Sequence, residues 1–375
     1  MKNYNEISER IQKYRRDLHE IPELSFQLPE TGAYIRKFLG KLSCRIDDIA
    51  GDGAAACFDF GKEEAVCFRC DMDALPIQEK NSLPYISKHE GRMHACGHDS
   101  HMAIMLGFAE LLEDMKKEGF IPSYNVILLF QPAEETIDGA YTICQTDFFK
   151  RYNIKYIFGL HNWPTLPKGQ ISSISGPMMA KSTSIDVHFK GVSAHCGEPW
   201  KGHDAMLASA RFLTEIYDYC NKVLNDGSLI RFGKMTSGTV RNAISASSEL
   251  IGTMRTFNEE SYEKILDAMD RIAAEIKEDL QVTVTPEVVK YHPAVINNPA
   301  LYERVIPSLD ELGYKELDKP VMIAEDFSFF QEQVPGVFFF LGTGSGIPLH
   351  SANYDMDDSA MIQGVKLFQS ILKNL

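Results

Sequence analysis

The stretch Asn125-Val126-Ile127-Leu128-Leu129-Phe130 decides how this chain folds. An almost wholly apolar run of this length, with β-branched residues in it, predicts a strand buried on both faces. Runs of the same kind occupy 65–69, 156–160 and 337–341. Strands buried on both faces are typical of a parallel sheet covered by helices. The sequence therefore predicts an α/β fold with a mainly parallel main sheet, flanked by amphipathic helices at 5–18 and 359–375.

A second pattern fills the middle of the chain, where strands and helices alternate differently. The expected elements are strand 184–190, helix 203–224, strand 229–237, strand 247–255, helix 259–280 and strand 281–290. The order βαββαβ is that of a ferredoxin-like sandwich. It interrupts the first pattern between the third and fourth strands. We therefore expect one domain at 1–181 and 292–375, with a second domain at 182–291 inserted into it.

Length and composition support this division and exclude some functions. A chain of 375 residues is too long for one hydrophobic core, so two domains are expected. The formal charge of −14 argues against a nucleic-acid partner and against an anionic membrane surface. The first residues lack the apolar core of a signal peptide, and the eight cysteines are scattered, as is typical of a reducing compartment. We expect a cytoplasmic protein.

The stretch from Met93 to His101 combines three imidazoles, a thiol and a carboxylate. Cys96 and His98 form a Cys-x-His pair, and both side chains suit zinc or a neighbouring transition metal. A His-rich loop with a buried free cysteine is the alternative. Because this stretch offers only two obvious ligands, a metal site needs further donors from elsewhere.

Such donors follow the predicted strands. They are Asp71 and Asp73, Glu134 and Glu135, His161, and His350. In open α/β sheets ligands bind at the carboxyl ends of the strands, so these side chains are expected to meet. Taken singly, each histidine is more often structural and a Glu-Glu pair is more often solvated. The two aspartates are either ligands or groups that orient ligand imidazoles.

Five donors suit two metal ions that share a ligand and a water molecule, which predicts a hydrolytic site. In an extended segment Glu134 and Glu135 would point to opposite sides, so one would bind metal and the other would move protons. The residues alone leave open which glutamate does which.

Several motifs resemble one family. They are 15–24 (RRDLHEIPEL), 71–76 (DMDALP), 93–99 (MHACGHD), 131–135 (QPAEE) and 324–328 (AEDFS). Together they resemble the aminoacylase and hippurate-hydrolase amidohydrolases, a branch of the co-catalytic metallopeptidases related to carboxypeptidase G. The resemblance spans the chain. It implies a zinc-peptidase-like catalytic domain and an inserted lid that usually mediates dimerisation.

The resemblance also assigns roles. It implies that two divalent ions per subunit, of zinc, manganese, cobalt or nickel, are held by Cys96, His98, Glu135, His161 and His350, and that Glu134 is the general acid and base. In the lid, His195 resembles an oxyanion-stabilising histidine, although Ser193-Ala194 stand where the family usually has two glycines. Arg255 and Asn242 resemble residues that bind the substrate carboxylate, and Ala243-Ile244-Ser245 weakens the match at Asn242.

These observations predict a metal-dependent amidohydrolase that acts on N-acyl amino acids or small peptides and forms a homodimer through the lid. A dipeptidase or carboxypeptidase and an N-acetyl-diaminopimelate deacetylase are alternatives on the same fold. A binding protein without catalytic activity and a structural zinc protein are alternatives of other classes.

Overall fold

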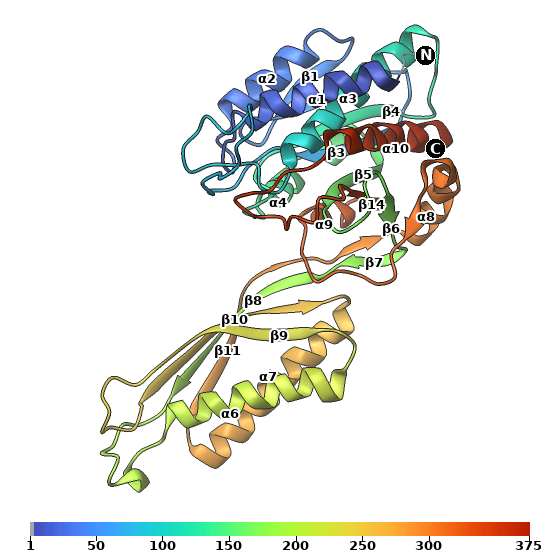
Figure 1. Cartoon of the computed structure of the whole chain (residues 1–375). Coiled ribbons are helices and arrows are strands. Elements are labelled where there is room, and N and C mark those ends of the chain that lie inside the picture. The colour runs from blue at the N-terminus through green and yellow to red at the C-terminus, as the bar shows by residue number, and fades with distance from the viewer. Residues whose placement is uncertain (1–3) are drawn as a thin grey trace. The chain divides into compact units, whose positions relative to one another are not determined.

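The computed structural model describes residues 4–375 and divides the chain into two compact units. The first unit comprises the chain up to Met178 together with Ile296–Lys319 and Glu325–Leu375; the second comprises Met179–Val295 and Pro320–Ala324. The chain therefore passes from one unit to the other at 178/179, 295/296, 319/320 and 324/325. Figure 1 colours both units along the chain.

The first unit is built on an eight-stranded sheet with the order β1-β2-β4-β3-β5-β14-β6-β13. Its strands are β1 (Arg45–Ile49), β2 (Gly53–Phe58), β3 (Ala65–Asp71), β4 (Asn125–Gln131), β5 (Ile154–Trp163), β6 (Ile171–Ser173), β13 (Lys315–Glu316) and β14 (Gly336–Gly342). The four apolar runs identified in the sequence form the central strands β4, β3, β5 and β14, which are parallel. The expected α/β fold is thus confirmed, while β1, β2 and β6 add antiparallel pairs that the sequence analysis did not predict.

Helices cover this sheet. They are α1 (Tyr4–His19), α2 (Pro29–Leu39), α3 (His98–Lys117), α4 (Gly139–Cys144), α5 (Phe148–Arg151), α8 (Pro299–Val305), α9 (Phe327–Gln331) and α10 (Met361–Asn374), with short 3-10 turns at Ile306–Leu312 and Asp358–Ala360. Figure 1 shows α1, α3 and α10 side by side. A Cβ on Gly107 of α3 would lie 2.5 Å from Ile11 of α1, so this glycine permits the close approach. A separate two-stranded sheet pairs β7 (Gly176–Met179) with β12 (Val295–Asn297).

The second unit is a ferredoxin-like sandwich. Its elements are β8 (Lys181–Lys190), a 3-10 turn (Pro199–Lys201), α6 (Ala205–Asp218), a π-helical turn (Tyr219–Leu224), β9 (Leu229–Ser237), β10 (Ser247–Thr256), α7 (Glu259–Leu280) and β11 (Thr283–His292). The sheet is antiparallel with the order β11-β8-β10-β9. Apolar side chains of α6, α7 and the sheet, such as Phe189, Phe212 and Ile272, form a core of their own.

Helix ends in this unit differ slightly from the expected bounds, and local contacts explain why. Asp204 caps α6 by accepting hydrogen bonds from the backbone N–H groups of Met206 and Leu207, so the helix begins at Ala205. Gln281 adopts a left-handed conformation with φ 56° after α7 and delays the start of β11. Among residues 4–375, no helix combines the length and the apolar character that a membrane crossing needs.

The core of the first unit contains a group of stacked and edge-on phenylalanines. The ring of Phe68 on β3 lies 4.9 Å from that of Phe108, 5.6 Å from that of Phe158 and 5.1 Å from that of Phe368, measured between centroids. These side chains are fully buried and come from two helices and two strands. Phe68 therefore joins the central sheet to the helices α3 and α10.

We expect Phe68→Ala to lower the free energy of unfolding by about 3–5 kcal/mol, because a large cavity would open at the centre of this group. Urea unfolding followed by circular dichroism measures the change. Ile121, with 70% of its side chain exposed, is the control: Ile121→Ala should change stability by about 0.5 kcal/mol or less. Equal losses in both variants would contradict the packing role of Phe68.

Candidate metal centre

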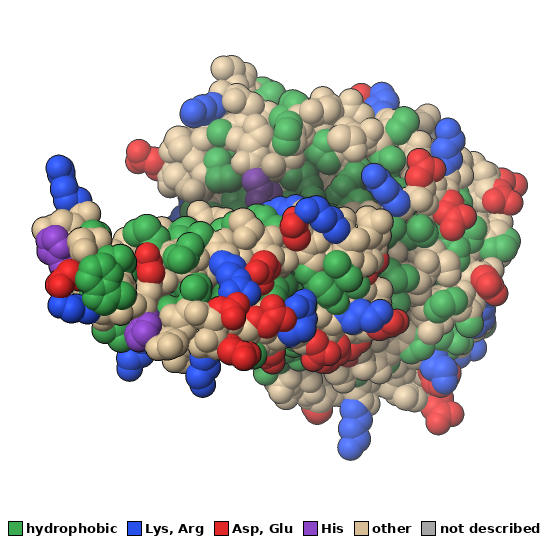
Figure 2. Space-filling model, turned by 90° about the horizontal axis from the view of Figure 1, so that it is seen from below, with side chains coloured by type: hydrophobic (Ala, Val, Ile, Leu, Met, Phe, Trp, Pro, Cys, Tyr) green, Lys and Arg blue, Asp and Glu red, His purple; other side chains and the backbone are tan. Residues whose placement is uncertain are grey.

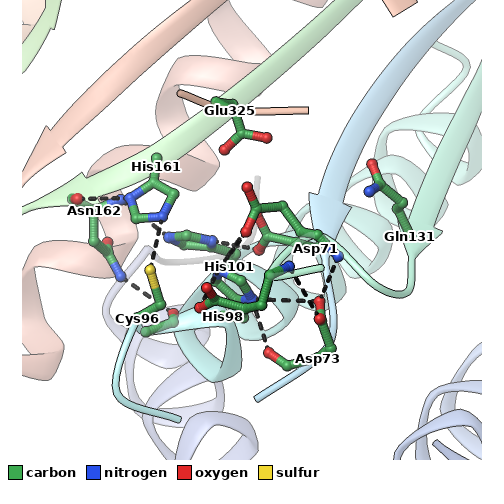
Figure 3. A network of polar contacts seen from close by, with 12 residues as sticks. Asp71, Asp73, Cys96, His98, His101, Gln131, His161, Asn162 and Glu325 are labelled. Carbon is green, nitrogen blue, oxygen red and sulfur yellow. Dashed lines mark hydrogen bonds and ion pairs between the residues drawn. The ribbon is translucent and has the colours of Figure 1, made fainter. Parts of the chain in front are cut away.

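The side chains that follow the central strands meet at the carboxyl ends of these strands. Cys96 Sγ lies 3.3 Å from His161 Nε2, and His350 Nε2 lies 3.5 Å from Glu135 Oε2. His98 Nε2 lies 3.8 Å from Glu134 Oε2 and 3.9 Å from Glu135 Oε1. Figure 3 shows the Cys96 thiol facing the His161 ring beside His98. The structure therefore brings together the donors that the strand ends carry in the sequence.

Two imidazoles in this cluster are held so that the same ring nitrogen, Nε2, faces the other donor atoms. His98 Nδ1 lies 2.8 Å from the carbonyl oxygen of Asp73, and His161 Nδ1 lies 2.8 Å from that of Asn162. A carbonyl only accepts, so in both rings Nδ1 carries the proton and donates it. Nε2 of each ring then presents a lone pair to the cluster, which is how metal-binding histidines are oriented.

The two glutamates lie on a turn, contrary to the extended segment expected from the sequence. Ala133 has φ 59°, and the N–H of Ile137 donates to the carbonyl oxygen of Glu134. Asp73 fixes the turn because its two carboxylate oxygens accept the N–H groups of Glu134 (2.9 Å) and Glu135 (3.1 Å). The expectation that the two carboxylates point to opposite sides is therefore wrong, since both lie within 4 Å of His98 Nε2.

Asp71 has both oxygens occupied by neighbouring side chains. Oδ1 lies 2.6 Å from His101 Nδ1, and Oδ2 accepts from Arg69 Nη1 at 3.0 Å. His101 Nε2 accepts the backbone N–H of Asn162 at 3.0 Å, so its Nδ1 is the protonated nitrogen that donates to Asp71. These contacts leave no free ring nitrogen on His101 and place Asp71 in a supporting position.

Arg69 is fully buried on β3 and gathers three further side chains. Nε donates to Gln131 Oε1 (2.7 Å), and Nη2 contacts Asp326 Oδ1 (2.7 Å) and Glu325 Oε1 (3.0 Å). Figure 3 shows the Glu325 carboxylate turned toward the cluster. The sequence analysis quoted Gln131, Glu325 and Asp326 within motifs but gave them no role, and it did not single out Arg69. An arginine inside an apolar strand is the signal that would have pointed to it, because a buried charge requires buried partners.

Burial dominates the electrostatics of the centre. Burial, then Glu325 and Glu135, raises the pKa of Glu134 well above its ordinary value. Burial and then Asp73 raise the pKa of Glu135 to about 8. Burial also lowers the pKa of His161 to about 3, so this imidazole is neutral near pH 7. Neutral imidazoles do not offset the charge of the crowded carboxylates, and the Arg69 guanidinium is already paired with Asp71, Glu325 and Asp326.

A cation fits this arrangement. The donor atoms form overlapping groups of three, and within each group the atoms lie within 4.8 Å of one another. Three of these groups are Cys96 with His98 and His161, Cys96 with Glu135 and His350, and His98 with Glu134 and Glu135. Among residues 4–375, His98 Nε2 and Glu135 Oε1 are buried without a hydrogen-bond partner. Buried polar atoms are rarely left unpaired, and thiol, imidazole and carboxylate together are suitable ligands for a transition metal.

The remaining predicted residues lie in the second unit. His195 follows β8, and its Nδ1 accepts the backbone N–H of Gly197 at 3.0 Å. It pairs with Ala243, next to Asn242, through an isolated β-bridge. Arg255 on β10 donates from Nε to the carbonyl oxygen of Met322 (3.2 Å) and from Nη1 to that of Met254 (3.1 Å). No carboxylate among the described residues is paired with Arg255.

A second buried network is formed by His19, Asp99 and Glu79, and Asp99 directly follows His98 in the chain. His19 Nδ1 lies 2.8 Å from Asp99 Oδ2, and its Nε2 lies 3.2 Å from Glu79 Oε1. Because both ring nitrogens face carboxylates, both must donate, and the ring is an imidazolium. Burial opposes this charge, but the hydrogen bonds to Asp99 and Glu79 outweigh burial and raise the pKa of His19 from 6.5 to about 9.

A family model places this centre among known enzymes. The model of peptidase family M20/M25/M40 matches residues 67–374, which include the whole donor cluster. The chain belongs to this peptidase family. The resemblance read from the motifs is thereby confirmed, and the chain is a metal-dependent amidohydrolase of the family.

Relatives match over almost the whole chain. An N-acetyldiaminopimelate deacetylase of Oceanobacillus iheyensis is 34% identical over 371 residues, which cover 96% of this chain and 98% of the relative. An uncharacterized hydrolase of Staphylococcus aureus is 32% identical over 380 residues and covers 99% of both chains. A crystal structure from Bacillus subtilis, described as a dinuclear metal binding peptidase from the M20 family, has a TM-score of 0.87, 30% identity and coverage of 99% and 100%.

The raised pKa of His19 predicts a pH-dependent stability. A group whose pKa is raised by folding stabilises the fold fully below its unfolded pKa, here 6.5, and loses this contribution as the pH rises through about 9. The groups that face His19 are Asp99, Glu79, Arg15 and the rings of His94 and Tyr85. At pH 6 we expect His19→Gln to cost about 3 kcal/mol, because buried carboxylates lose their charged partner. Urea unfolding should show a smaller difference from wild type at pH 10.

The control is His188 in the second unit, which is exposed on the sheet. His188→Gln should change stability little at either pH. A difference between wild type and His19→Gln that stays constant from pH 6 to pH 10 would contradict the raised pKa.

Proposed function

We propose that this enzyme hydrolyses the amide bond of N-acyl amino acids and that two divalent ions, held by Cys96, His98, Glu135, His161 and His350, serve the reaction. The observation that carries the proposal is the turn at Glu134 and Glu135, which Asp73 fixes so that both carboxylates lie within 4 Å of His98 Nε2. Cys96, His98 and Glu135 each belong to two of the three donor groups named above, so the groups overlap as expected where two ions would be held close together. When bound, such ions lower the pKa of a water molecule and polarise the amide carbonyl.

Glu134 is the proposed general base and acid. It accepts a proton from the attacking water and passes it to the leaving nitrogen. Burial and the neighbouring carboxylates favour its protonated form, which is the form needed to donate in the second step. The positive charge of bound divalent ions would lower the pKa of Glu134 and favour its ionised form, which accepts the proton in the first step. Asp73 keeps the carboxylate in place through the backbone of the turn.

We expect Glu134→Gln to lower kcat by about 100-fold or more while metal content stays that of the wild type, because the variant loses proton transfer but no ligand. Glu135→Gln should lose metal, since its carboxylate is the proposed ligand. Steady-state kinetics and metal analysis by inductively coupled plasma mass spectrometry measure the two effects. Metal loss in Glu134→Gln with full metal in Glu135→Gln would exchange the two roles.

Arg255 is the proposed binding residue for the substrate carboxylate, with Asn242 as its neighbour in this role. Its guanidinium is half-buried, its contacts are to backbone carbonyls and to Thr253, and it has no carboxylate partner among the described residues. Burial lowers the pKa of Arg255, as expected where a buried cation lacks an anion. A carboxylate is the ligand that such a guanidinium binds best.

We expect Arg255→Ala to lower kcat/KM for an N-acyl amino acid by about 10- to 100-fold, because a charge-assisted hydrogen bond is lost. The control is the same substrate with its carboxylate converted to an amide, whose kcat/KM should barely change. Initial rates on the two substrates make the comparison. Equal losses on both would mean that Arg255 supports the second unit instead of binding substrate.

His195 is the proposed oxyanion stabiliser, and the second unit is the proposed dimerisation domain. This unit exposes large apolar side chains, among them Trp200 (76%), Leu207 (55%) and Val240 (59%). Figure 2 shows apolar side chains interspersed with charged ones on the face that it displays. A second copy of this unit that covered these side chains would remove their apolar surface from water, which favours association. Sedimentation of the pure protein tests the dimer, and a monomer would reject it.

A substrate panel tests the proposed function. It contains N-acetyl and longer N-acyl amino acids, dipeptides and N-acetyl-diaminopimelate, each assayed after metal is added to chelated enzyme. The last substrate is a second candidate, favoured by the 34% identity to a deacetylase of that name. Hydrolysis of acyl amino acids supports the proposal, and a preference for N-acetyl-diaminopimelate narrows it. Hydrolysis of dipeptides alone would reject it in favour of a peptidase.

A further inference from the structure

We propose that Arg15 and His19 are positioning residues for the metal centre: through Asp99 they fix the first turn of α3 and thereby the direction in which Cys96 and His98 present their ligand atoms. This inference rests on the proposed function, because it assumes that these two side chains bind metal. Neither Arg15 nor His19 belongs to the donor groups of the centre. Both lie on the last turns of α1, which the sequence places about 80 residues before the ligands.

Arg15 and His19 both contact the same oxygen atom of Asp99, Oδ2. Asp99 directly follows His98 in the first turn of α3, where Gly97 has φ 85°. Its Oδ2 accepts from Arg15 Nε at 3.2 Å and from His19 Nδ1 at 2.8 Å, and all three side chains are fully buried. Asp99 Oδ1 is buried without a hydrogen-bond partner among residues 4–375. Two cations from α1 therefore determine where this carboxylate lies.

The network has firm attachments on its other side. Arg15 donates to Asp355 Oδ1 (3.0 Å) and the carbonyl oxygen of Met356 (3.3 Å), and it contacts Asp358. These residues follow His350 in the chain, so the same arginine contacts the segments that bear two sets of proposed ligands. His19 Nε2 contacts Glu79, whose other oxygen accepts the backbone N–H of Ser87 at 2.7 Å. The network is thus attached to two further segments, 355–358 and the loop that carries Glu79 and Ser87.

A small movement of Asp99 matters because metal ligands tolerate little displacement. Ligand distances must lie within about 0.2 Å of their ideal values. The carbonyl oxygen of Asp73 holds His98 Nδ1. If the first turn of α3 rotated, the imidazole would tilt about this hydrogen bond and its Nε2 atom would move away from the cluster. Loss of groups that orient ligands typically weakens metal binding by about 10- to 100-fold. A network that only joined α1 to α3 would have no such effect.

The protein contains a matched control for that simpler role. Arg10 Nε contacts Glu110 Oε2 at 2.7 Å, and the Tyr14 hydroxyl donates to Glu110 Oε1 at 2.6 Å. These contacts to Glu110 join the same two helices, α1 and α3. Glu110 lies about three turns along α3 from His98, where the helix begins. Arg10→Met therefore weakens the helix contact without touching Asp99.

The test compares two variants of His19 that lose the same charge. An asparagine amide nitrogen lies about where His Nδ1 lies and can still donate to Asp99, whereas a glutamine amide nitrogen lies about where Nε2 lies and donates to Glu79. The probe is Co²⁺, titrated into chelated full-length protein against a competing chelator. The absorption band from the Cys96 thiolate to cobalt reports the geometry of the centre. Thermal melting of each metal-free variant reports stability.

We expect His19→Gln to raise the apparent Kd for Co²⁺ about 10-fold or more and to shift the thiolate band. His19→Asn should raise the Kd by about 3-fold or less, and Arg10→Met should leave both readouts unchanged even if its melting temperature falls. Equal Kd values for the Asn and Gln variants would overturn the inference, as would a melting loss without any change in Kd. Wild-type protein that binds no Co²⁺ would overturn the proposed function itself, which separates the two failures.

Discussion

The buried guanidinium of Arg69 is the interaction on which the geometry of the centre depends. A full charge on the middle strand of the sheet is stable only with buried partners, and the chain supplies Asp71, Glu325, Asp326 and Gln131. These partners come from β3, from the end of β4 and from the segment before α9. Arg69 therefore fixes three parts of the chain at the carboxyl end of the sheet.

A chain of hydrogen bonds leads from Arg69 to the side chains proposed as metal ligands. Arg69 holds Asp71, Asp71 holds His101, and His101 accepts the N–H of Asn162, whose carbonyl in turn orients His161. Asp73, two residues along the same strand end, fixes the glutamate turn through two backbone N–H groups. Groups that are already oriented lose little freedom when a cation binds, and this favours tight binding.

The sequence predicted the structure best where a local pattern of residue types has one common structural meaning. Apolar runs predicted the central strands, and the position of the polar donors at their ends predicted that these side chains would meet, as they do. The antiparallel strands β1 and β6 were not predicted, because β1 is a charged edge strand and β6 has only three residues, so neither carries a strong apolar pattern. The turn at Glu134 was not predicted either, since it depends on Ala133 in a left-handed conformation and on Asp73, 61 residues away. Contacts of this kind depend on the folded chain and leave no local pattern.

The segment Pro320–Ala324 changes how the second unit can be treated as a module. Its carbonyl groups at Val321 and Ile323 accept the N–H of Ala180, and its Met322 carbonyl accepts from Arg255. A fragment cut at 179 and 295 would lack these partners and would leave the guanidinium of Arg255 without its main-chain acceptor at Met322. Grafting this unit between family members thus requires two pieces of chain, and recombination with a single pair of breakpoints would separate parts that fold together.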